Sequence, residues 1–417
     1  MKKIIIEGNK ILSGKIKIGG AKNSVVALIP ASIMATGKVE ISNVPNISDK
    51  DALIEIIKLL NADVILNKDV MKINAKNIKN KVIPEELSNK LRASYYFMGA
   101  LLARFKHVEI YFPGGCNIGT RPIDLHLKGF EMLGATITKE DTKYIISAEE
   151  LNGSNIFLDF PSVGATINIM LAATLAKGTT IIDNAAREAE IVNIAELLNN
   201  LGANIKGAGT DKIIIEGVEK LHGGKIKVMP DRIEAGTYVI MGALLGKNLE
   251  IDGLVPEHNI VLLNKLQEMG VDFKLDNHKM ILNKSNHLKP TNIRTVAYPG
   301  FPTDLGQPMA VLLTQADGIS LFEETIWENR MGHVKYLNQM GAKIEAERQH
   351  AKIEGRTPLH GEEITATDLR AGAALVTAGL IAEGTTIIND VEHILRGYER
   401  IINKLSKVGA NIKIIEV

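Results

Sequence analysis

A six-fold internal repeat is the feature that most constrains how this 417-residue chain can fold. A small turn, usually Gly followed by Ala or Val and a polar residue, returns about every 70 residues. The six copies are Asn61-Ala62-Asp63, Gly134-Ala135-Thr136, Gly202-Ala203-Asn204, Gly270-Val271-Asp272, Gly341-Ala342-Lys343 and Gly409-Ala410-Asn411. A short β-like run keeps the same interval, at Val39–Ile41, Val108–Ile110, Thr180–Ile182, Leu249–Ile251, Ile319–Phe322 and Thr386–Ile388. The chain is therefore predicted to consist of six copies of one unit.

Each unit contains two different helical segments. One is amphipathic, as in Leu53, Ile56, Ile57 and Leu60, where the i, i+3, i+4, i+7 spacing indicates one wet face. The other is apolar on nearly all sides and is therefore expected to be buried. The six apolar segments are Val25–Met34, Tyr95–Leu102, Ile167–Leu175, Tyr238–Leu245, Met309–Leu313 and Ala373–Ile381. A chain of this length exceeds one ordinary core, so we predict an α/β fold of two domains, each with three buried helices wrapped by sheets and outer helices.

The strands predict how the repeat closes. A hairpin formed by Ile4–Gly8 and Lys15–Ile18 is expected to recur as Ile213–Gly217 with Lys225–Val228. The last unit ends at Ile412–Val417 without such a hairpin, so the N-terminal strands are expected to complete it. A six-unit solenoid with open ends is the alternative, but it would leave an unpaired apolar edge that favours aggregation.

This closure predicts a split domain. The chain would cross between domains near Gly19-Gly20 and again near Met229-Pro230. One domain would then consist of residues 1–20 and 230–417, and the other of residues 21–229.

Composition excludes several classes of protein. With 49 basic and 48 acidic residues and a net charge of +1, the chain does not resemble a nucleic-acid clamp or a membrane-surface protein. The apolar run Ile4–Ile6 stops at Glu7, which is too short for a signal peptide, and a single cysteine suggests no oxidising compartment. A soluble cytoplasmic protein is expected, with small-molecule substrates, no obligate protein partner, no cofactor, and no metal, since cysteine and histidine do not cluster.

Polar and cationic residues precede the buried helices. In a repeat protein these loops are equivalent, so they are expected to line one cleft between the domains, where helix N-termini favour phosphate or carboxylate. The loops are Lys22-Asn23-Ser24, Leu91-Arg92-Ala93-Ser94, Ser162-Val163-Gly164, Asp231-Arg232, Thr303-Asp304 and Asp368-Leu369-Arg370. The anion clamp would include Lys22, Arg92, Arg121, Arg330, Arg370 and Arg396. For any one Ser, Asp or Asn, helix capping is the more common role.

The chain's only cysteine, Cys116, lies in a loop that departs from the repeat. The segment from Phe112 to Pro122 holds three glycines and two prolines, which is typical of an ordered but movable excursion. A lone cysteine is usually a small buried residue. Cys116 lies in no apolar period and is near Arg121, a setting that favours a reactive thiol.

Gly-Gly-Cys-Asn-Ile-Gly-Thr-Arg-Pro-Ile-Asp-Leu-His at 114–126 closely resembles the UDP-N-acetylglucosamine 1-carboxyvinyltransferase family. The resemblance extends over essentially the whole chain and is also carried by Gly-Gly-Ala-Lys-Asn (19–23), Leu-Arg-Ala-Ser (91–94), Ser-Val-Gly-Ala-Thr (162–166), Pro-Thr-Asp-Leu (302–305), Glu-Asn-Arg (328–330) and Asp-Leu-Arg-Ala-Gly (368–372). It implies two inside-out α/β barrel-like domains of three repeats each. It also implies transfer of the enolpyruvyl group of phosphoenolpyruvate to the 3′-hydroxyl of UDP-N-acetylglucosamine, the first committed step of peptidoglycan synthesis.

The resemblance also implies roles for individual residues. Lys22, Asn23, Arg121 and Arg396 match phosphoenolpyruvate contacts, which assigns that substrate and the Cys116 loop mainly to domain 21–229. The positions that match UDP-sugar contacts are Arg92, Arg121, Pro122, Ile123, Asp124, Leu125, Ser162, Val163, Asp304 and Ile326. Family members often carry Lys where this chain has Phe160.

The reaction explains these residue types. Addition across an enol ether needs a proton at the methylene carbon and removal of the hydroxyl proton, followed by elimination of phosphate. Cys116 is the expected acid and Asp304 the expected base. The resemblance also implies that the epoxide antibiotic fosfomycin alkylates Cys116. Lys22, Arg121 and Arg396 would bind the substrate's anionic groups. Two alternatives are transfer to a shikimate-type acceptor and a non-catalytic UDP-sugar-binding paralogue.

Overall fold

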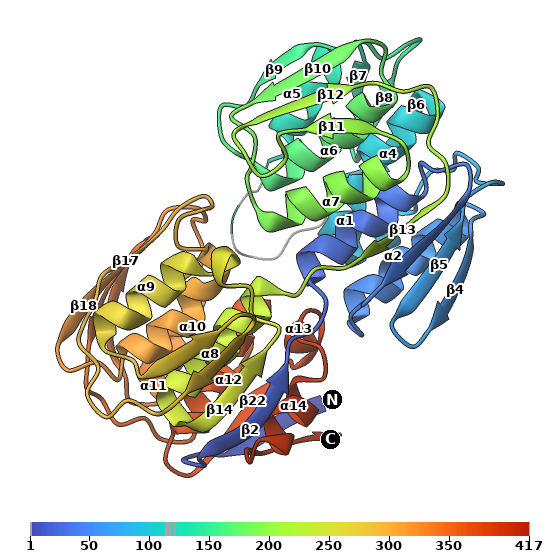
Figure 1. Ribbon diagram of the computed structural model, residues 1–417. Coiled ribbons are helices and arrows are strands. Elements are labelled where there is room, and N and C mark those ends of the chain that lie inside the picture. Colours follow the sequence, from blue (N-terminus) through green and yellow to red (C-terminus); the bar gives the residue numbers. More distant parts are fainter. Residues whose placement is uncertain (1, 113–118, 120–121, 417) are drawn as a thin grey trace. The chain divides into compact units, whose positions relative to one another are not determined.

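The computed structural model describes residues 2–112, 119 and 122–416, so Cys116 and Arg121 lie outside the described residues. These residues form two compact units (Figure 1). Unit 1 contains residues 2–19, 119 and 230–416, and unit 2 contains residues 20–112 and 122–229. Each unit encloses a separate hydrophobic core.

Unit 2 is built around three buried helices, as the apolar segments predicted. These are α1 (Lys22–Ser32), α4 (Tyr96–Phe105), which follows the 3₁₀ turn η1 (Arg92–Tyr95), and α6 (Val163–Thr174). Outside them lie α2 (Ser48–Leu59), α3 (Glu85–Lys90), α5 (Asp124–Met132) and α7 (Ala189–Asn200). The strands are β3 (Lys38–Ser42), β4 (Asp63–Asn67), β5 (Val70–Asn74), β6 (His107–Tyr111), β7 (Thr136–Lys139), β8 (Lys143–Ser147), β9 (Asn155–Phe157), β10 (Thr179–Asp183), β11 (Asn204–Lys206), β12 (Lys212–Glu216) and β13 (Gly224–Lys227). They form three small sheets, ordered β13-β3-β5-β4, β6-β8-β7 and β11-β12-β10-β9.

Unit 1 repeats the plan. Its buried helices are α8 (Arg232–Leu245), α10 (Thr303–Leu313) and α12 (Leu369–Ile381). Its other helices are η2 (Pro256–His258), α9 (Ile260–Met269), α11 (Gly332–Gln339), α13 (Glu392–Leu395) and α14 (Ile401–Lys407). Its strands are β1 (Lys2–Glu7), β2 (Leu12–Lys17), β14 (Gly246–Asp252), β15 (Phe273–Asp276), β16 (Lys279–Leu282), β17 (Ile293–Thr295), β18 (Ile319–Glu324), β19 (Lys343–Glu347), β20 (His350–Glu354), β21 (Glu363–Thr365), β22 (Thr385–Asn389) and β23 (Asn411–Glu416). The sheets are β15-β16-β14-β2, β17-β18-β20-β19 and β21-β22-β1-β23.

The repeated turn has a backbone reason. All six of its first residues adopt a positive φ, and they are Asn61, Gly134, Gly202, Gly270, Gly341 and Gly409. Glycine adopts this left-handed conformation without steric cost, and asparagine tolerates it better than most other residues. Each turn ends an outer helix and redirects the chain into the following strand, which is why the marker recurs in every unit.

The N-terminal strand completes the last repeat, as expected. β1 lies between β22 and β23 and pairs antiparallel with both, with Ile4 opposite Ile388 on one side and Ile414 on the other. The predicted hairpins, however, are wrong. β2 leaves β1 and pairs parallel with β14, and β13 leaves β12 and pairs parallel with β3. These parallel partners lie far away in sequence, so local pattern could not distinguish them from hairpin strands.

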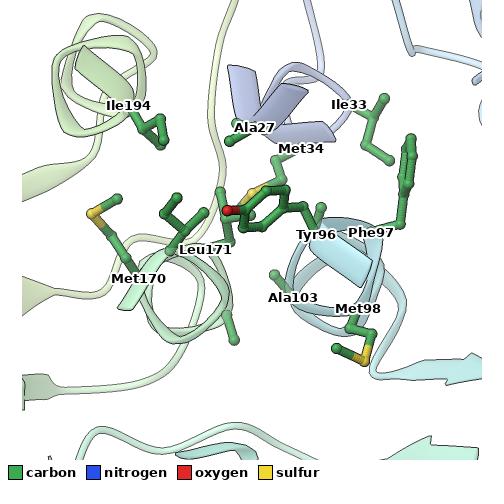
Figure 2. Close-up of a cluster of buried hydrophobic side chains, with 14 of the residues drawn as sticks. Ala27, Ile33, Met34, Tyr96, Phe97, Met98, Ala103, Met170, Leu171 and Ile194 are labelled. Atoms are coloured by element: carbon green, nitrogen blue, oxygen red, sulfur yellow. The ribbon is translucent and has the colours of Figure 1, made fainter. Parts of the chain in front are cut away.

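The cores are close-packed. In unit 2, Figure 2 shows buried side chains of Ala27 from α1, Tyr96 from α4, Leu171 from α6 and Ile194 from α7 within one cluster. A β-carbon added at Gly99 of α4 would lie 2.4 Å from the Asn168 carbonyl oxygen of α6, so these two helices approach too closely for a larger residue. Truncating a large buried side chain in such a core costs about 2–5 kcal/mol of stability.

No helix among residues 2–112, 119 and 122–416 is long and apolar enough to cross a membrane.

Candidate active site

Three of the polar residues before the buried helices act as helix caps. Ser162 accepts a hydrogen bond from the Ala165 N–H at 3.3 Å. Asp231 and Asp368 each accept two backbone N–H bonds in the first turns of α8 and α12, at 2.8 and 3.0 Å. For these positions the capping role is therefore present in the structure, and it occupies one oxygen of each aspartate. The helices α1 and α10 instead begin after Ala21 and Pro302, whose side chains cannot cap.

Asp304 is the centre of the charged cluster in unit 1. Its Oδ1 lies 2.6 Å from Nη2 of Arg330, and its Oδ2 lies 2.9 Å from Nη2 of Arg370. Both arginines are at most 5 % exposed, whereas the Asp304 side chain is 23 % exposed, so the carboxylate stays accessible while its two cationic partners are buried. Burial alone would raise the pKa of Asp304, but Arg370 and Arg330 outweigh it and hold that pKa well below its usual range. The fold thus brings Asp304 together with Arg330 and Arg370, which lie 26 and 66 positions further along the chain and which the sequence predicted separately.

Arg370 is anchored on its other side by aromatic and hydroxyl groups. Its guanidinium carbon lies 5.4 Å from the centre of the Tyr398 ring, within cation–π range. The Tyr398 hydroxyl lies 2.9 Å from Oγ1 of Thr237, which hydrogen-bonds the Ile233 carbonyl. Burial opposes the charge of Arg370, but Asp304 and Tyr398 raise the pKa of this guanidinium, so it stays cationic. Tyr398 and Thr237 were missed by sequence reasoning, because a buried Tyr resembles ordinary core.

Glu324, also missed, lies beside this cluster. It ends β18 and is 1 % exposed. One carboxylate oxygen accepts the backbone N–H groups of Ile326 and Trp327, at 2.8 and 3.2 Å. The other accepts the Thr303 hydroxyl at 2.6 Å. The predicted residue Ile326 thus lies in a turn that a buried carboxylate holds.

In unit 2, Lys22 begins α1 and its ammonium lies 3.1 Å from Oδ2 of Asp49 in α2. The lysine side chain is 15 % exposed and the aspartate 3 %, so the positive charge stays at the helix N-terminus, opposite a buried counter-ion. Asn23 follows it and is half-buried. A fixed cation at a helix N-terminus suits an anionic ligand.

His126 lies between Tyr95, whose ring is near Arg92, and helix α6. The Arg92 guanidinium lies 5.8 Å from the centre of the Tyr95 ring, and that ring meets His126 edge-on at 5.1 Å. Burial lowers the pKa of His126 to about 3, and the positive charge of Arg92 lowers it in the same direction, so this ring is neutral. Its Nδ1 lies 3.0 Å from the amide nitrogen of Asn168. His126 is therefore a structural residue that positions α5 against α6.

The segment 122–125 differs in exposure along its length. Pro122 and Asp124 are exposed, Leu125 is half-buried, and Ile123 is 7 % exposed and belongs to the unit 2 core. Ile123 can therefore present little more than its backbone to a ligand. Phe160, at the position where the family often has Lys, is 46 % exposed. Arg396, at the end of α13 in unit 1, is half-buried.

A metal site and a surface hollow are two other candidates for a functional site, and both are less well supported than the Asp304 cluster. Among the residues that the structure describes, no group of three or more His, Cys, Asp or Glu side chains could hold a metal ion. A hollow of about 630 Å³ lies on β17–β20 and is lined by residues such as Arg294, Glu323 and His350. It contains none of the predicted site residues, and its carboxylates and cations pair with one another across the strands. The buried Asp304 cluster carries the stronger chemical signal.

Comparison with known proteins decides the family. Residues 6–405 match the family model described as EPSP synthase (3-phosphoshikimate 1-carboxyvinyltransferase). The chain is 50 % identical over its full length to a protein of Streptococcus mutans named UDP-N-acetylglucosamine 1-carboxyvinyltransferase 2, which it covers completely. It is 50 % identical, over 98 % of this chain and 97 % of the relative, to the Listeria monocytogenes protein of the same name. The chain belongs to the UDP-N-acetylglucosamine 1-carboxyvinyltransferase group of the EPSP synthase family.

Solved structures support the enolpyruvyl transferase fold. The enolpyruvyl transferase NikO from Streptomyces tendae matches with a TM-score of 0.90 at 26 % identity, covering 100 % of this chain and 99 % of that one. EPSP synthase from Acinetobacter baumannii matches over the full length of both chains with a TM-score of 0.77 at 20 % identity, which supports the fold alone. The predicted α/β class and the family resemblance are confirmed.

Proposed function

We propose that this enolpyruvyl transferase moves the enolpyruvyl group of phosphoenolpyruvate to the 3′-hydroxyl of UDP-N-acetylglucosamine and releases phosphate, the first committed step of peptidoglycan synthesis. The observation that carries the proposal is the 50 % identity, over the full length, to enzymes named for that activity. We further propose that it acts in the cytoplasm, as two inside-out domains of three repeats each.

The reaction needs an acid, a base and cations. In this proposal Cys116 delivers a proton to the methylene carbon, and Asp304 accepts the proton of the sugar hydroxyl as its oxygen bonds to the adjacent carbon. The methyl group so formed gives up a proton again as phosphate leaves, which restores the enol ether. Lys22, Arg121 and Arg396 bind the phosphate and carboxylate groups and stabilise the charge of the departing phosphate. UDP-N-acetylglucosamine is bound by Arg92, residues 121–125, Ser162, Val163 and Ile326.

The Asp304 cluster imposes a condition on this mechanism. A carboxylate paired with Arg330 and Arg370 is always ionised near neutral pH, as a base must be, but its low pKa makes it a weak one. An anionic substrate group that competes for either arginine weakens its pairing with Asp304 and raises the pKa of that carboxyl. Binding of the substrates would thus strengthen the base that acts on them.

The test is phosphate release from phosphoenolpyruvate by the purified chain. Release should require UDP-N-acetylglucosamine, and shikimate 3-phosphate in its place should give none. Asp304→Ala should bind both substrates but release no phosphate. Phosphate release with shikimate 3-phosphate but not with UDP-N-acetylglucosamine would show that the acceptor is of the shikimate type. Binding of UDP-N-acetylglucosamine with no turnover would identify a non-catalytic relative.

A further inference from the structure

The connection between Glu324 and Asp304 runs through one hydroxyl group. Thr303 begins α10, directly before Asp304. Its Oγ1 donates to Oε2 of Glu324 at 2.6 Å and accepts from Nη1 of Arg330 at 2.8 Å. Nη2 of the same arginine donates to Oδ1 of Asp304 at 2.6 Å. The guanidinium is therefore held by two consecutive residues of one helix.

The direction of these bonds follows from the chemistry of the groups. A threonine hydroxyl has one proton to donate, and an arginine can only donate. Because a carboxylate oxygen accepts the proton of Thr303, the hydroxyl's lone pairs are left for Arg330. Glu324 thus sets the orientation of Thr303, and Thr303 sets that of Arg330.

The surroundings make this arrangement rigid. Glu324 is 1 % exposed and Arg330 5 %, so neither can exchange its partners for water without opening the core. The backbone of Arg330 is held as well, because the Gln307 side-chain amide donates to its carbonyl at 3.0 Å. A buried carboxylate is costly to keep unless it is hydrogen-bonded, and here both oxygens of Glu324 are used.

We propose that Glu324 and Thr303 are positioning residues for the transfer reaction, acting on Asp304 through Arg330. This inference rests on the proposed role of Asp304 as base. Without the Thr303 hydroxyl, Arg330 keeps its bond to Asp304 but loses the contact that fixes the plane of its guanidinium. Asp304 then loses the orientation needed to meet the sugar hydroxyl, which lowers the rate of the chemical step more than it weakens substrate binding.

The chain offers variants that separate positioning from folding. Thr303→Val removes the hydroxyl at constant shape, and Thr303→Ser keeps it. Glu324→Gln can keep its oxygen on the Ile326 and Trp327 N–H groups while presenting an amide N–H₂ to Thr303, so the turn is retained and only the bond to Thr303 is reversed. The matched controls are Thr325→Val and Glu323→Gln. Thr325 bonds Thr295 and Glu323 pairs with Arg294, away from Arg330.

The experiment measures kcat and KM for both substrates by phosphate release, with the folded fraction of each variant checked by circular dichroism. Thr303→Val and Glu324→Gln should lower kcat by about 10- to 100-fold with each KM within about 3-fold of wild type. Thr303→Ser should restore kcat to within about 3-fold, and both controls should match wild type.

Three outcomes would overturn the inference. The first is an unchanged kcat in Glu324→Gln, and the second is an equal loss of kcat in Thr303→Val and Thr303→Ser. The third is a loss of activity that a smaller folded fraction explains, with a normal kcat per folded molecule. Thr303→Ser and Glu324→Gln decide the question even if Thr303→Val does not fold. Wild-type protein that releases no phosphate with UDP-N-acetylglucosamine would overturn the proposed function as well, whereas active wild type with unaffected variants refutes the positioning role alone.

Discussion

A buried acid in α8 should make the stability of unit 1 depend on pH in an unusual direction. Glu234 is 3 % exposed, its Oε1 lies 2.6 Å from the Lys404 ammonium, and its Oε2 accepts the Gly19 N–H at 2.7 Å. Burial raises the pKa of Glu234 to about 7, because Lys404 offsets only part of the cost of desolvating the carboxylate and Asp231 adds repulsion. The perturbation is Glu234→Gln, a neutral group of the same shape.

The size of the effect follows from the two pKa values. In the unfolded chain the pKa of Glu234 is near its ordinary 4.5. Between pH 4.5 and 7 the folded protein therefore holds a proton that the unfolded chain has lost, so stability falls as pH rises. A pKa difference of about 2.5, at about 1.4 kcal/mol for each pKa unit, lowers the free energy of unfolding by about 3 kcal/mol across this pH window. Below pH 4.5 the contribution is complete, and above pH 7 no more is lost.

Urea unfolding can isolate this unit. The chain has one tryptophan, Trp327, which lies in unit 1 and reports its unfolding by fluorescence. Wild type should lose about 3 kcal/mol of unfolding free energy relative to Glu234→Gln between pH 4.5 and 8. Glu345→Gln, at a side chain that is 81 % exposed, is the matched control and should follow wild type. If wild type instead gains stability relative to Glu234→Gln as pH rises, pairing with Lys404 outweighs burial and the reasoning is wrong.

Three further predictions concern the candidate site. Cys116→Asp should retain turnover, because a carboxylic acid can also donate the proton, and should resist alkylation by fosfomycin; an inert Cys116→Asp beside an active Cys116→Ala would refute the acid role. Titration of the Cys116 thiol should give a pKa near the ordinary thiol value, since a strongly acidified thiol would be a poor proton donor. Gly164→Ala would bring a methyl group within 2.8 Å of His126 Cε1 and 2.9 Å of the Tyr95 hydroxyl, so calorimetry should show a loss of about 1–3 kcal/mol.

The sequence predicted what depends on local rules. The six turns were visible because a left-handed backbone restricts position 134 and its equivalents to glycine or asparagine. The six buried helices were visible because they are apolar on all sides. The parallel pairing of β2 with β14, and of β13 with β3, was not visible. Each pair joins strands more than a hundred residues apart and leaves no local pattern in the sequence.

The candidate site divides in the same way. Motifs identified Asp304, Arg330 and Arg370, which the structure brings into contact, but not the groups that hold them. Glu324 follows Glu323 in sequence and looks like a second solvated acid. The alternation of β18 carried a usable signal, since Glu324 has the same parity as the buried Ser320 and Phe322. A charged residue on the apolar face of a strand is a reason to look for buried partners.

The place of β1 between β22 and β23 has a consequence for how the protein is made. Residues 2–7 are synthesised before their partners at 385–416, which follow about 20 to 80 s later at ~5–20 residues per second. Residues 20–229, by contrast, contain every strand of their own three sheets and can complete them while synthesis continues. The apolar strand Ile4–Ile6 must therefore wait unpaired until β22 and β23 are made. Premature termination of the chain leaves this strand exposed as an edge that other chains can join.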